Sequence, residues 1–255
     1  MTKPHLTLLT GGSRGMGLAM AQQLLSPGRL LVCIARHTCE PLATRAADQG
    51  AGLEQWTLDL AQPVDAAAQL RNWLQAQRAD RFASATLINN AGTIPPIAPL
   101  SDSDPATLSQ ALRVGLEAPM LLTAVFLGAT EVWGVPRKVL NISSGLGRRA
   151  MASQAAYCAA KAGMDHFTRC LALDEARKPQ GARVCALAPG VIDTDMQTQL
   201  RSANAAQFPD QHNFAQLKAG GQLTLPADAA ARVLAWLERP DFGAEPVADV
   251  RDAQV

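Results

Sequence analysis

The chain has almost no net charge and no paired cysteines. Its 255 residues carry 23 Lys and Arg against 22 Asp and Glu, a formal net charge of +1. That balance offers no electrostatic attraction to nucleic acid or to an anionic membrane. The five cysteines and four histidines contain no CxxC pair and no metal-ligand spacing. We therefore expect reduced thiols, no metal site and a cytoplasmic protein.

Long hydrophobic runs and targeting segments are also lacking. The N-terminal apolar run at 2–9 is too short for a signal peptide, and no small-residue cleavage site follows it. The longest apolar stretch, 114–129, is interrupted by Glu117 and Pro119, and we expect it to fall short of a membrane span. With 48% hydrophobic residues, the chain is predicted to be globular, with a sizeable core.

What the sequence does contain is a regular alternation of strand and helix patterns. Short aliphatic and β-branched runs predict strands at 5–9, 30–35, 53–59, 85–89, 138–142, 183–187 and 247–250. Amphipathic segments lie between them, for example the one with Val233, Leu234 and Leu237 on one face. The alternation predicts the α/β class: a Rossmann-like, doubly wound parallel sheet of about seven strands with helices on both faces. No linker divides the chain, so we expect residues 1–255 to form a single domain.

One segment, 193–222, has little periodicity and is rich in Gln, Asn and Ala. A polar excursion between a strand and a late helix is typical of either a disordered stretch or a lid over a site. Scattered apolar residues suit a lid with an apolar lining, although in a loop they are also common as ordinary packing: Met196, Leu200, Phe208, Phe214 and Leu217.

A glycine-rich turn follows the first predicted strand, and a helical pattern begins directly after it. The glycines allow a tight turn and close approach of the backbone to a pyrophosphate, while the helix N-terminus presents N–H groups to the anion. An isolated glycine triplet also occurs in ordinary βα turns, but the strand before it and the helix after it favour dinucleotide binding. The expected contacts come from Gly11, Ser13, Arg14, Gly15, Met16 and Gly17.

The end of the second strand indicates which dinucleotide is bound. An NAD enzyme usually places an acidic residue there to hold the ribose 2′-hydroxyl. This strand ends Ala35-Arg36-His37, and no acid follows until Glu40. Either Arg36 or Arg14 alone would be interpreted as a solvated surface charge, but together they are suited to hold a 2′-phosphate by charge-assisted hydrogen bonds. The pair predicts NADPH/NADP+ as the cofactor.

Tyr157 and Lys161 stand four residues apart in a helical segment, so they share a face one turn apart. An ammonium beside a phenol stabilises the phenolate and lowers the pKa of the phenol toward the range of a general acid. Tyr157 is the only tyrosine in the chain. Ser144, with Ser143 as its neighbour, lies just past the fifth predicted strand, at the sheet edge where such folds bind ligands. Tyr/Lys pairs at this spacing are commonly found in surface packing. The presence of the glycine turn in the same sequence is what favours a catalytic role for this pair.

In their order along the chain, the motifs resemble the short-chain dehydrogenase/reductase superfamily over essentially the whole sequence. They are the glycine turn, Asn89-Asn90-Ala91-Gly92, Tyr157-x-x-x-Lys161 and Pro189-Gly190. Finer features, among them Glu117-Ala118-Pro119-Met120, are similar to the branch that contains sepiapterin reductase and bacterial benzil reductase. The resemblance implies an NADPH-dependent carbonyl reductase that uses Ser144, Tyr157 and Lys161. It further implies that the substrate is a vicinal dicarbonyl or a pterin side-chain ketone.

The resemblance also implies further cofactor contacts and an assembly. Lys161 would hold the nicotinamide ribose, and Asp59 would border the adenine, although a helix cap is an equal alternative for Asp59. The remaining contacts would come from Leu60, Asn90, Ala91, Gly92, Pro189, Gly190, Val191, Ile192 and Thr194. A homodimer or homotetramer is expected through two long helices at about 104–133 and 153–178, whose Ala- and Leu-rich faces are more apolar than solvated helices need.

One position departs from the family pattern. The family usually has an asparagine in the long helix after the fourth strand, and Gly115 stands there instead. The resemblance implies a proton relay from Lys161 through a water on this residue's backbone carbonyl. Gly115 keeps a carbonyl, and Pro119, four residues on, has no N–H to bond it. We therefore expect a bend at 115–119 that preserves the relay; the alternative is that glycine only weakens the helix and impairs the enzyme.

Two other functions remain open at this point. One is an NAD(H)-linked alcohol dehydrogenase that works in oxidation, which the Ala35-Arg36 strand end disfavours. The other is a catalytically weakened NADP-binding sensor or scaffold, which only Gly115 favours. Reduction of a ketone by NADPH remains the leading prediction.

Overall fold

The computed structural model describes residues 2–252, and its centre is a seven-stranded sheet in which every neighbouring pair of strands is parallel. The strand order is β3-β2-β1-β4-β5-β6-β7. The strands are β1 (His5–Thr10), β2 (Arg29–Ala35), β3 (Gly52–Thr57), β4 (Ser84–Asn89), β5 (Arg137–Ile142), β6 (Arg183–Ala188) and β7 (Val247–Asp249). The order reverses between β1 and β4, and in such sheets ligands bind outside the carboxyl ends of the strands at this switch point.

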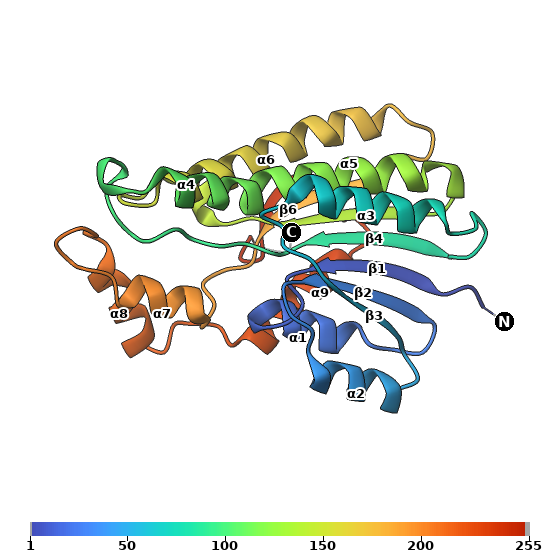
Figure 1. The fold of residues 1–255 in the computed structure, drawn as a ribbon, viewed down its shortest axis with the longest axis horizontal. Helices are drawn as coiled ribbons and strands as arrows, with labels where there is room; N and C mark the ends of the chain where they lie inside the picture. The colour runs from blue at the N-terminus through green and yellow to red at the C-terminus, as the bar shows by residue number, and fades with distance from the viewer. Residues whose placement is uncertain (1, 253–255) are drawn as a thin grey trace.

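Helices cover both faces of the sheet (Figure 1). One face carries α3 (Pro63–Gln75), α4 (Pro105–Leu112), α5 (Ala118–Thr130) and α6 (Ala155–Ala176), and the other carries α1 (Gly15–Leu24), α2 (Glu40–Asp48) and α9 (Pro226–Leu237). Because successive side chains of a strand point to opposite faces, β2 places Val32 and Ile34 in one apolar core and Leu31 and Cys33 in the other. The predicted doubly wound parallel sheet is confirmed.

A continuous helical run from Pro105 to Trp133 joins α4 to α5 through a π-helical turn at Arg113–Glu117. The run passes through Glu117 and Pro119 and is 29 residues long, which is enough to cross a membrane. The expectation that this apolar stretch would be too short for a membrane span was therefore wrong. Its mean hydropathy of 1.5 also suits a span. However, 50% of the apolar window is buried inside the structure, where α5 packs against α3 and α6. It has the packing of a core helix.

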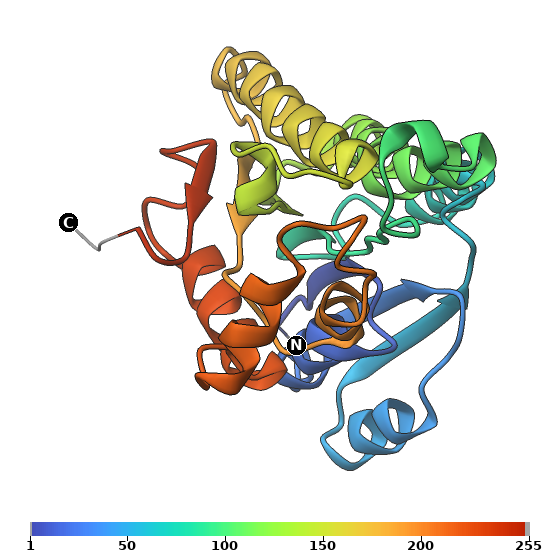
Figure 2. The same cartoon turned by 90° about the vertical axis from the view of Figure 1, so that its left-hand side faces the viewer.

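The segment predicted as a lid or a disordered stretch contains two short helices, α7 (Asp195–Arg201) and α8 (Gln211–Ala219). Figure 2 shows both lying across the edge of the sheet where the strands end. A bridge between Ile192 and Thr224 closes the base of the segment. Phe208 is fully buried and stacks on Phe214, with ring centroids 5.7 Å apart. The apolar residues of this segment therefore form a small core between it and the rest of the molecule.

Candidate active site

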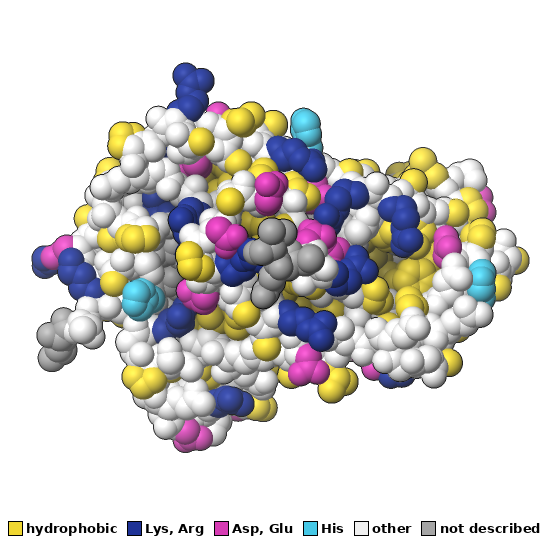
Figure 3. All heavy atoms as spheres, turned by 180° about the vertical axis from the view of Figure 1, so that it is seen from behind, with side chains coloured by type: hydrophobic (Ala, Val, Ile, Leu, Met, Phe, Trp, Pro, Cys, Tyr) yellow, Lys and Arg dark blue, Asp and Glu magenta, His cyan; other side chains and the backbone are white. Residues whose placement is uncertain are grey.

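A cavity of about 1270 Å³ lies at the carboxyl ends of the strands, between the glycine turn and the α7–α8 segment. In Figure 3 a hollow with hydrophobic side chains on its floor opens at the end of the molecule that carries this segment. The cavity brings together all the predicted site residues: Gly11, Ser13, Arg14, Gly15, Met16, Gly17, Arg36, Asp59, Leu60, Asn90, Ala91, Gly92, Ser144, Tyr157, Lys161, Pro189, Gly190, Val191, Ile192 and Thr194.

The glycine turn between β1 and α1 has no room for a side chain at Gly17. A Cβ at Gly17 would lie 2.0 Å from the Gly11 carbonyl oxygen and 2.5 Å from Asn90 Nδ2. Gly11 and Gly15 have φ values of +71° and +54°, which favour glycine. The first turn of α1 receives no hydrogen bond from a capping side chain, so its backbone N–H groups are available to an anion. This cradle fits the pyrophosphate of a dinucleotide.

Hydrogen bonds from the two residues that follow β4 hold the glycine turn in place. Asn90 Nδ2 donates to the Thr10 carbonyl at 3.0 Å and to the Gly11 carbonyl at 3.3 Å. The Thr10 hydroxyl accepts from the backbone N–H groups of Asn90 and Ala91, at 2.9 and 3.0 Å. Asn90 therefore holds the backbone that would surround the cofactor. Sequence reasoning did not identify Thr10 as its partner.

The two arginines predicted for the 2′-phosphate differ in their surroundings. Arg36 follows β2 and is exposed on the cavity wall. Arg14 pairs with Asp195 at the start of α7, with 2.9 Å between Nη1 and Oδ2. Both partners are largely exposed. The ion pair links the glycine turn to the α7–α8 segment.

Asp59 lies on the cavity wall, two residues after β3 ends. Its side chain accepts a hydrogen bond from the Ala61 backbone N–H at 2.9 Å. The N-cap residue of α3 is Gln62, so the alternative interpretation of Asp59 as a helix cap was wrong. The position of Asp59 in the cavity remains compatible with a place beside the adenine.

Ser144, Tyr157 and Lys161 come together from the end of β5 and the first turns of α6. Ser144 begins the short 3₁₀ turn Gly145–Gly147, and its hydroxyl accepts from the Leu146 N–H at 3.2 Å. Lys161 is buried, and its Nζ donates to the Ile142 carbonyl at 2.7 Å. The same Nζ lies 5.8 Å from the centroid of the Tyr157 ring.

The pKa of Tyr157 differs from the sequence-based expectation. Burial raises the pKa of this phenol above its usual value, and the hydrogen bond with Ser144 only partly opposes the rise. The Lys161 ammonium was expected to lower the pKa of Tyr157. Its Nζ instead donates to the carbonyl of Ile142, the last residue of β5. Burial lowers the pKa of Lys161 itself to about 8, opposed by the charge of Asp165. The chain alone therefore favours the protonated phenol, the form that donates a proton.

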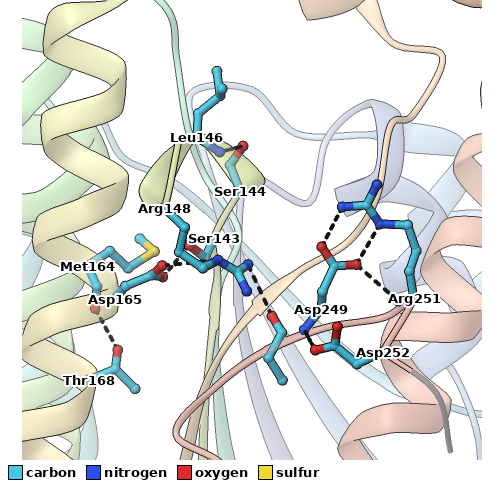
Figure 4. Close-up of polar contacts among 11 residues, drawn as sticks. Ser143, Ser144, Leu146, Arg148, Met164, Asp165, Thr168, Asp249, Arg251 and Asp252 are labelled. Carbon is cyan, nitrogen blue, oxygen red and sulfur yellow. Dashed lines mark hydrogen bonds and ion pairs between the residues drawn. The ribbon is translucent and has the colours of Figure 1, made fainter. Parts of the chain in front are cut away.

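A buried carboxylate beneath these residues was not predicted from the sequence, although its spacing is visible there: Asp165 lies four residues after Lys161. Ser143 donates a hydrogen bond to Asp165 Oδ1, and Arg148 Nε lies 3.8 Å from Oδ2. Figure 4 shows the Arg148 side chain lying beside the Asp165 carboxylate, while its guanidinium end points away and donates to the Ala248 carbonyl at 3.4 Å. A Cβ at Gly147 would lie 2.7 Å from Asp165 Oδ2, so glycine makes room for this contact. Ser143 is thus engaged with Asp165, and Ser144 is the serine beside Tyr157.

Gly115 is buried in the π-helical turn, where the sequence predicted a bend. The Ala118 N–H bonds the Arg113 carbonyl, five residues back. Pro119 has no N–H to serve the Gly115 carbonyl in the usual helical manner. π-Helical turns inside α-helices occur frequently at functional sites. A Cβ at Gly115 would lie 3.1 Å from the Ala160 Cβ, one residue before Lys161.

The fold and the site together define an oxidoreductase of the Rossmann-like class, with a dinucleotide cradle and a Ser-Tyr-Lys group in one cavity. The family model for short chain dehydrogenases matches residues 5–205. The chain belongs to this family, whose members use nicotinamide cofactors and act on the carbonyl or hydroxyl groups of small molecules.

Two similar proteins and one solved structure place the chain within the family. A benzil reductase ((S)-benzoin forming) of Bacillus cereus is 34% identical over 235 residues, 92% of this chain and 94% of that protein. A sepiapterin reductase of Meriones unguiculatus is 32% identical over 249 residues, 92% of each chain. An Agrobacterium tumefaciens structure with bound NADP has a TM-score of 0.78 and 26% identity, and covers 97% of this chain and 95% of that chain. The predicted resemblance to this branch is confirmed.

Proposed function

We propose that this protein is an NADPH-dependent reductase of ketones, with vicinal dicarbonyls or pterin side-chain ketones as its substrate class. The observation that carries the proposal is the Ser144, Tyr157 and Lys161 group in the same cavity as the glycine cradle. The names of the similar proteins, benzil reductase and sepiapterin reductase, support this choice of substrates. The whole chain would work as a single dinucleotide-binding oxidoreductase domain with the α7–α8 segment as its lid.

The residues around the cavity fit a bound NADPH, which supplies a hydride to the carbonyl carbon. The backbone of the glycine turn and the N-terminus of α1 would bind the pyrophosphate, with Asn90 supporting the turn. Lys161 would hold the nicotinamide ribose. We assign the preference for NADPH to Arg36, whose guanidinium is free to pair with a 2′-phosphate, with Arg14 as a second contact.

The chain's own residues would orient the substrate and move the proton. The Ser144 hydroxyl donates to the carbonyl oxygen, and the Tyr157 hydroxyl donates to it and then transfers its proton. The Lys161 ammonium, which lies 5.8 Å from the centroid of the Tyr157 ring, would stabilise the phenolate that remains. A water between the Gly115 carbonyl and Lys161 would return a proton to this pair. The raised pKa of Tyr157 keeps its proton in place until the substrate oxygen develops charge.

We also propose a cytoplasmic homo-oligomer. The expected interface lies on α5 and α6, where Met120 and Leu173 are 45% and 71% exposed. Large exposed apolar side chains on neighbouring helices are typical of association surfaces.

An NADPH-oxidation screen over diketones, aryl ketones, quinones and pterins tests the proposed function. We expect turnover of at least one vicinal dicarbonyl, with NADPH preferred over NADH. Preference for NADH together with oxidation of alcohols would favour the alcohol dehydrogenase alternative. Tight NADPH binding without turnover of any carbonyl would favour the sensor alternative.

A further inference from the structure

One face of α6 contacts three consecutive residues at the end of β5. Tyr157, Lys161 and Asp165 are spaced four residues apart, so they lie on the same side of the helix in successive turns. Each of them contacts a different residue of the strand end: Lys161 contacts Ile142, Asp165 contacts Ser143, and Tyr157 contacts Ser144. The proposed reaction uses Tyr157 and Lys161 and gives the buried carboxylate between α6 and the strand end no role.

The contact between Asp165 and Ser143 lies inside the molecule. Asp165 is 1% exposed and Ser143 is 3% exposed. The Ser143 hydroxyl donates to Oδ1 of the carboxylate (Figure 4), and the Ser143 backbone N–H donates to the Leu187 carbonyl of β6 at 2.9 Å. Burial of a carboxylate carries a desolvation cost, and apolar side chains can dock a helix on a sheet without it. Packing alone therefore does not account for a carboxylate at this position.

The same carboxylate packs against the chain on both sides of Ser144. Ser143 comes directly before Ser144, and the 3₁₀ turn Gly145–Gly147 follows directly after it. A Cβ at Gly147 would lie 2.7 Å from Asp165 Oδ2, so this turn packs closely on the carboxylate. The Gly147 N–H also bonds the Ser144 carbonyl at 2.9 Å. The backbone of Ser144 is thus held between a hydrogen bond and a close packing contact with one side chain of α6.

The relative position of two hydroxyl groups gives this arrangement its importance. In the proposed reaction, the hydroxyls of Ser144 and Tyr157 bind the same carbonyl oxygen, although one belongs to the end of β5 and the other to α6. A displacement of about 1 Å between groups that act together can cost roughly a hundredfold in rate. The strand end and α6 must therefore keep a fixed offset at this point, and Asp165 joins them there.

We propose that Asp165 is a positioning residue that holds the Ser144 hydroxyl in register with Tyr157 for the carbonyl substrate. Asp165 acts through Ser143 and the 3₁₀ turn, and it does not line the cavity itself. This inference rests on the proposed reductase function and adds a residue to the machinery of that site.

A double-mutant cycle between Asp165 and Ser144 tests the proposal, with NADPH and benzil as the reactants. Asp165→Ala should lower kcat roughly ten- to a hundredfold, while the Kd of NADPH stays unchanged. In a Ser144→Ala background the same change should cost little more, because the hydroxyl that it misplaces is already absent. The rates are measured well below the pKa of Lys161, which is about 8, so that the ammonium keeps its charge in every variant.

Two further variants separate positioning from stability. Asp165→Asn can still bond the Ser143 hydroxyl, so it should recover most of the kcat that Asp165→Ala loses. Thr168→Val is the matched control, because it removes another buried hydrogen bond between α6 and β5, the one from Asn141 Nδ2 to Thr168 Oγ1 at 2.9 Å. This control should lower the melting temperature and leave kcat nearly unchanged.

If Asp165→Ala does not fold, Ser143→Ala takes its place in the cycle, because it removes the donor of the same hydrogen bond. Equal losses of kcat with and without the Ser144 hydroxyl would overturn the inference and leave the reductase function standing, as would an unchanged kcat in Asp165→Ala. Absence of NADPH oxidation by the wild type with benzil and with every other carbonyl compound would instead overturn the proposed function, on which this role depends.

Discussion

The ring of Tyr157 packs against residues of the α7–α8 segment, and its hydroxyl is the proton donor of the proposed mechanism. Tyr157→Phe retains the ring and removes the proton, so NADPH binding should be preserved. Turnover should fall by roughly 10²–10⁴, the usual contribution of a positioned general acid. Stopped-flow binding and steady-state rates, measured on one preparation, check both halves. A variant that keeps most of its rate would show that the proton comes from another group.

Arg36 is the residue on which the cofactor preference depends. Arg36→Ala should weaken NADPH binding by roughly ten- to a hundredfold, the value of one charged hydrogen bond to a phosphate, and leave NADH binding nearly unchanged. Arg14→Ala is the control, because Arg14 already pairs with Asp195 and its loss should cost less. Fluorescence titration with both cofactors measures the two dissociation constants. Equal losses for NADPH and NADH would contradict the assignment.

Asp165 should set the pH range of the reaction through Lys161. The pKa of Lys161 is lowered to about 8 by burial, and the Asp165 charge opposes this shift. The ammonium is present below this pKa and is lost as the pH rises through it. Asp165→Asn removes the opposing charge, so the alkaline decline of kcat should move to lower pH. A pH–rate profile measures the shift; an unchanged alkaline limb would restrict Asp165 to holding Ser143 in place.

At the scale of residues, the sequence predicts what lies within one motif and misses what the fold brings together. Tyr157 and Lys161 are four residues apart, and this spacing points to catalysis only together with the glycine turn; the role of Ser144 came from the family resemblance. Arg14, in contrast, pairs with Asp195, which lies 181 positions away in the sequence, and no local sequence pattern predicts that ion pair. The Thr10 hydroxyl likewise accepts from the Asn90 backbone N–H across 80 positions, and nothing in the sequence near either residue indicates that contact.

Among the elements, the strands were predictable because both faces of the sheet are covered. A strand buried on both sides is a short continuous apolar run, as in Leu30–Ile34 of β2, and such runs are distinct from the polar segments between them. The two helices of the α7–α8 segment are only 7 and 9 residues long. They are too short for a repeating pattern of apolar residues to identify them as helices. Pro119 suggested an interruption of the long helix, but the helical run continues through it, directly after the π-helical turn at Arg113–Glu117 in which the hydrogen bonds are shifted by one residue.

The π-helical turn gives the unusual Gly115 a testable role. Pro119→Ala supplies an N–H that competes for the Gly115 carbonyl, and it should therefore lower kcat more than Gly115→Asn does. The crowding of a Cβ against Ala160, at 3.1 Å, adds a cost in stability to any substitution of Gly115. Gly115→Ala controls for this crowding, and thermal melting separates it from the effect on rate. A larger kcat loss in Gly115→Asn than in Pro119→Ala would contradict the relay.

At the scale of the whole molecule, the apolar faces of α5 and α6 should associate. Leu173 on α6 is 71% exposed, and burying such side chains against a second copy would contribute about 1.5–3 kcal/mol each. Light scattering at micromolar concentration should report a dimer or tetramer. Leu173→Lys should shift the equilibrium toward the monomer, whereas the same change at the exposed Val64 on α3 should not. A wild-type monomer would contradict the proposed assembly.

The presence of one tyrosine in the chain has a practical consequence for spectroscopy. A sample labelled with ¹³C at the tyrosine ring gives a single phenol signal, which needs no assignment because it can only come from Tyr157. The ionisation of the group that we assign as the proton donor can thus be followed directly, with and without cofactor, in the unmodified protein. Few enzymes allow their acid to be observed without a mutation or an attached probe, and here the amino-acid composition provides the label.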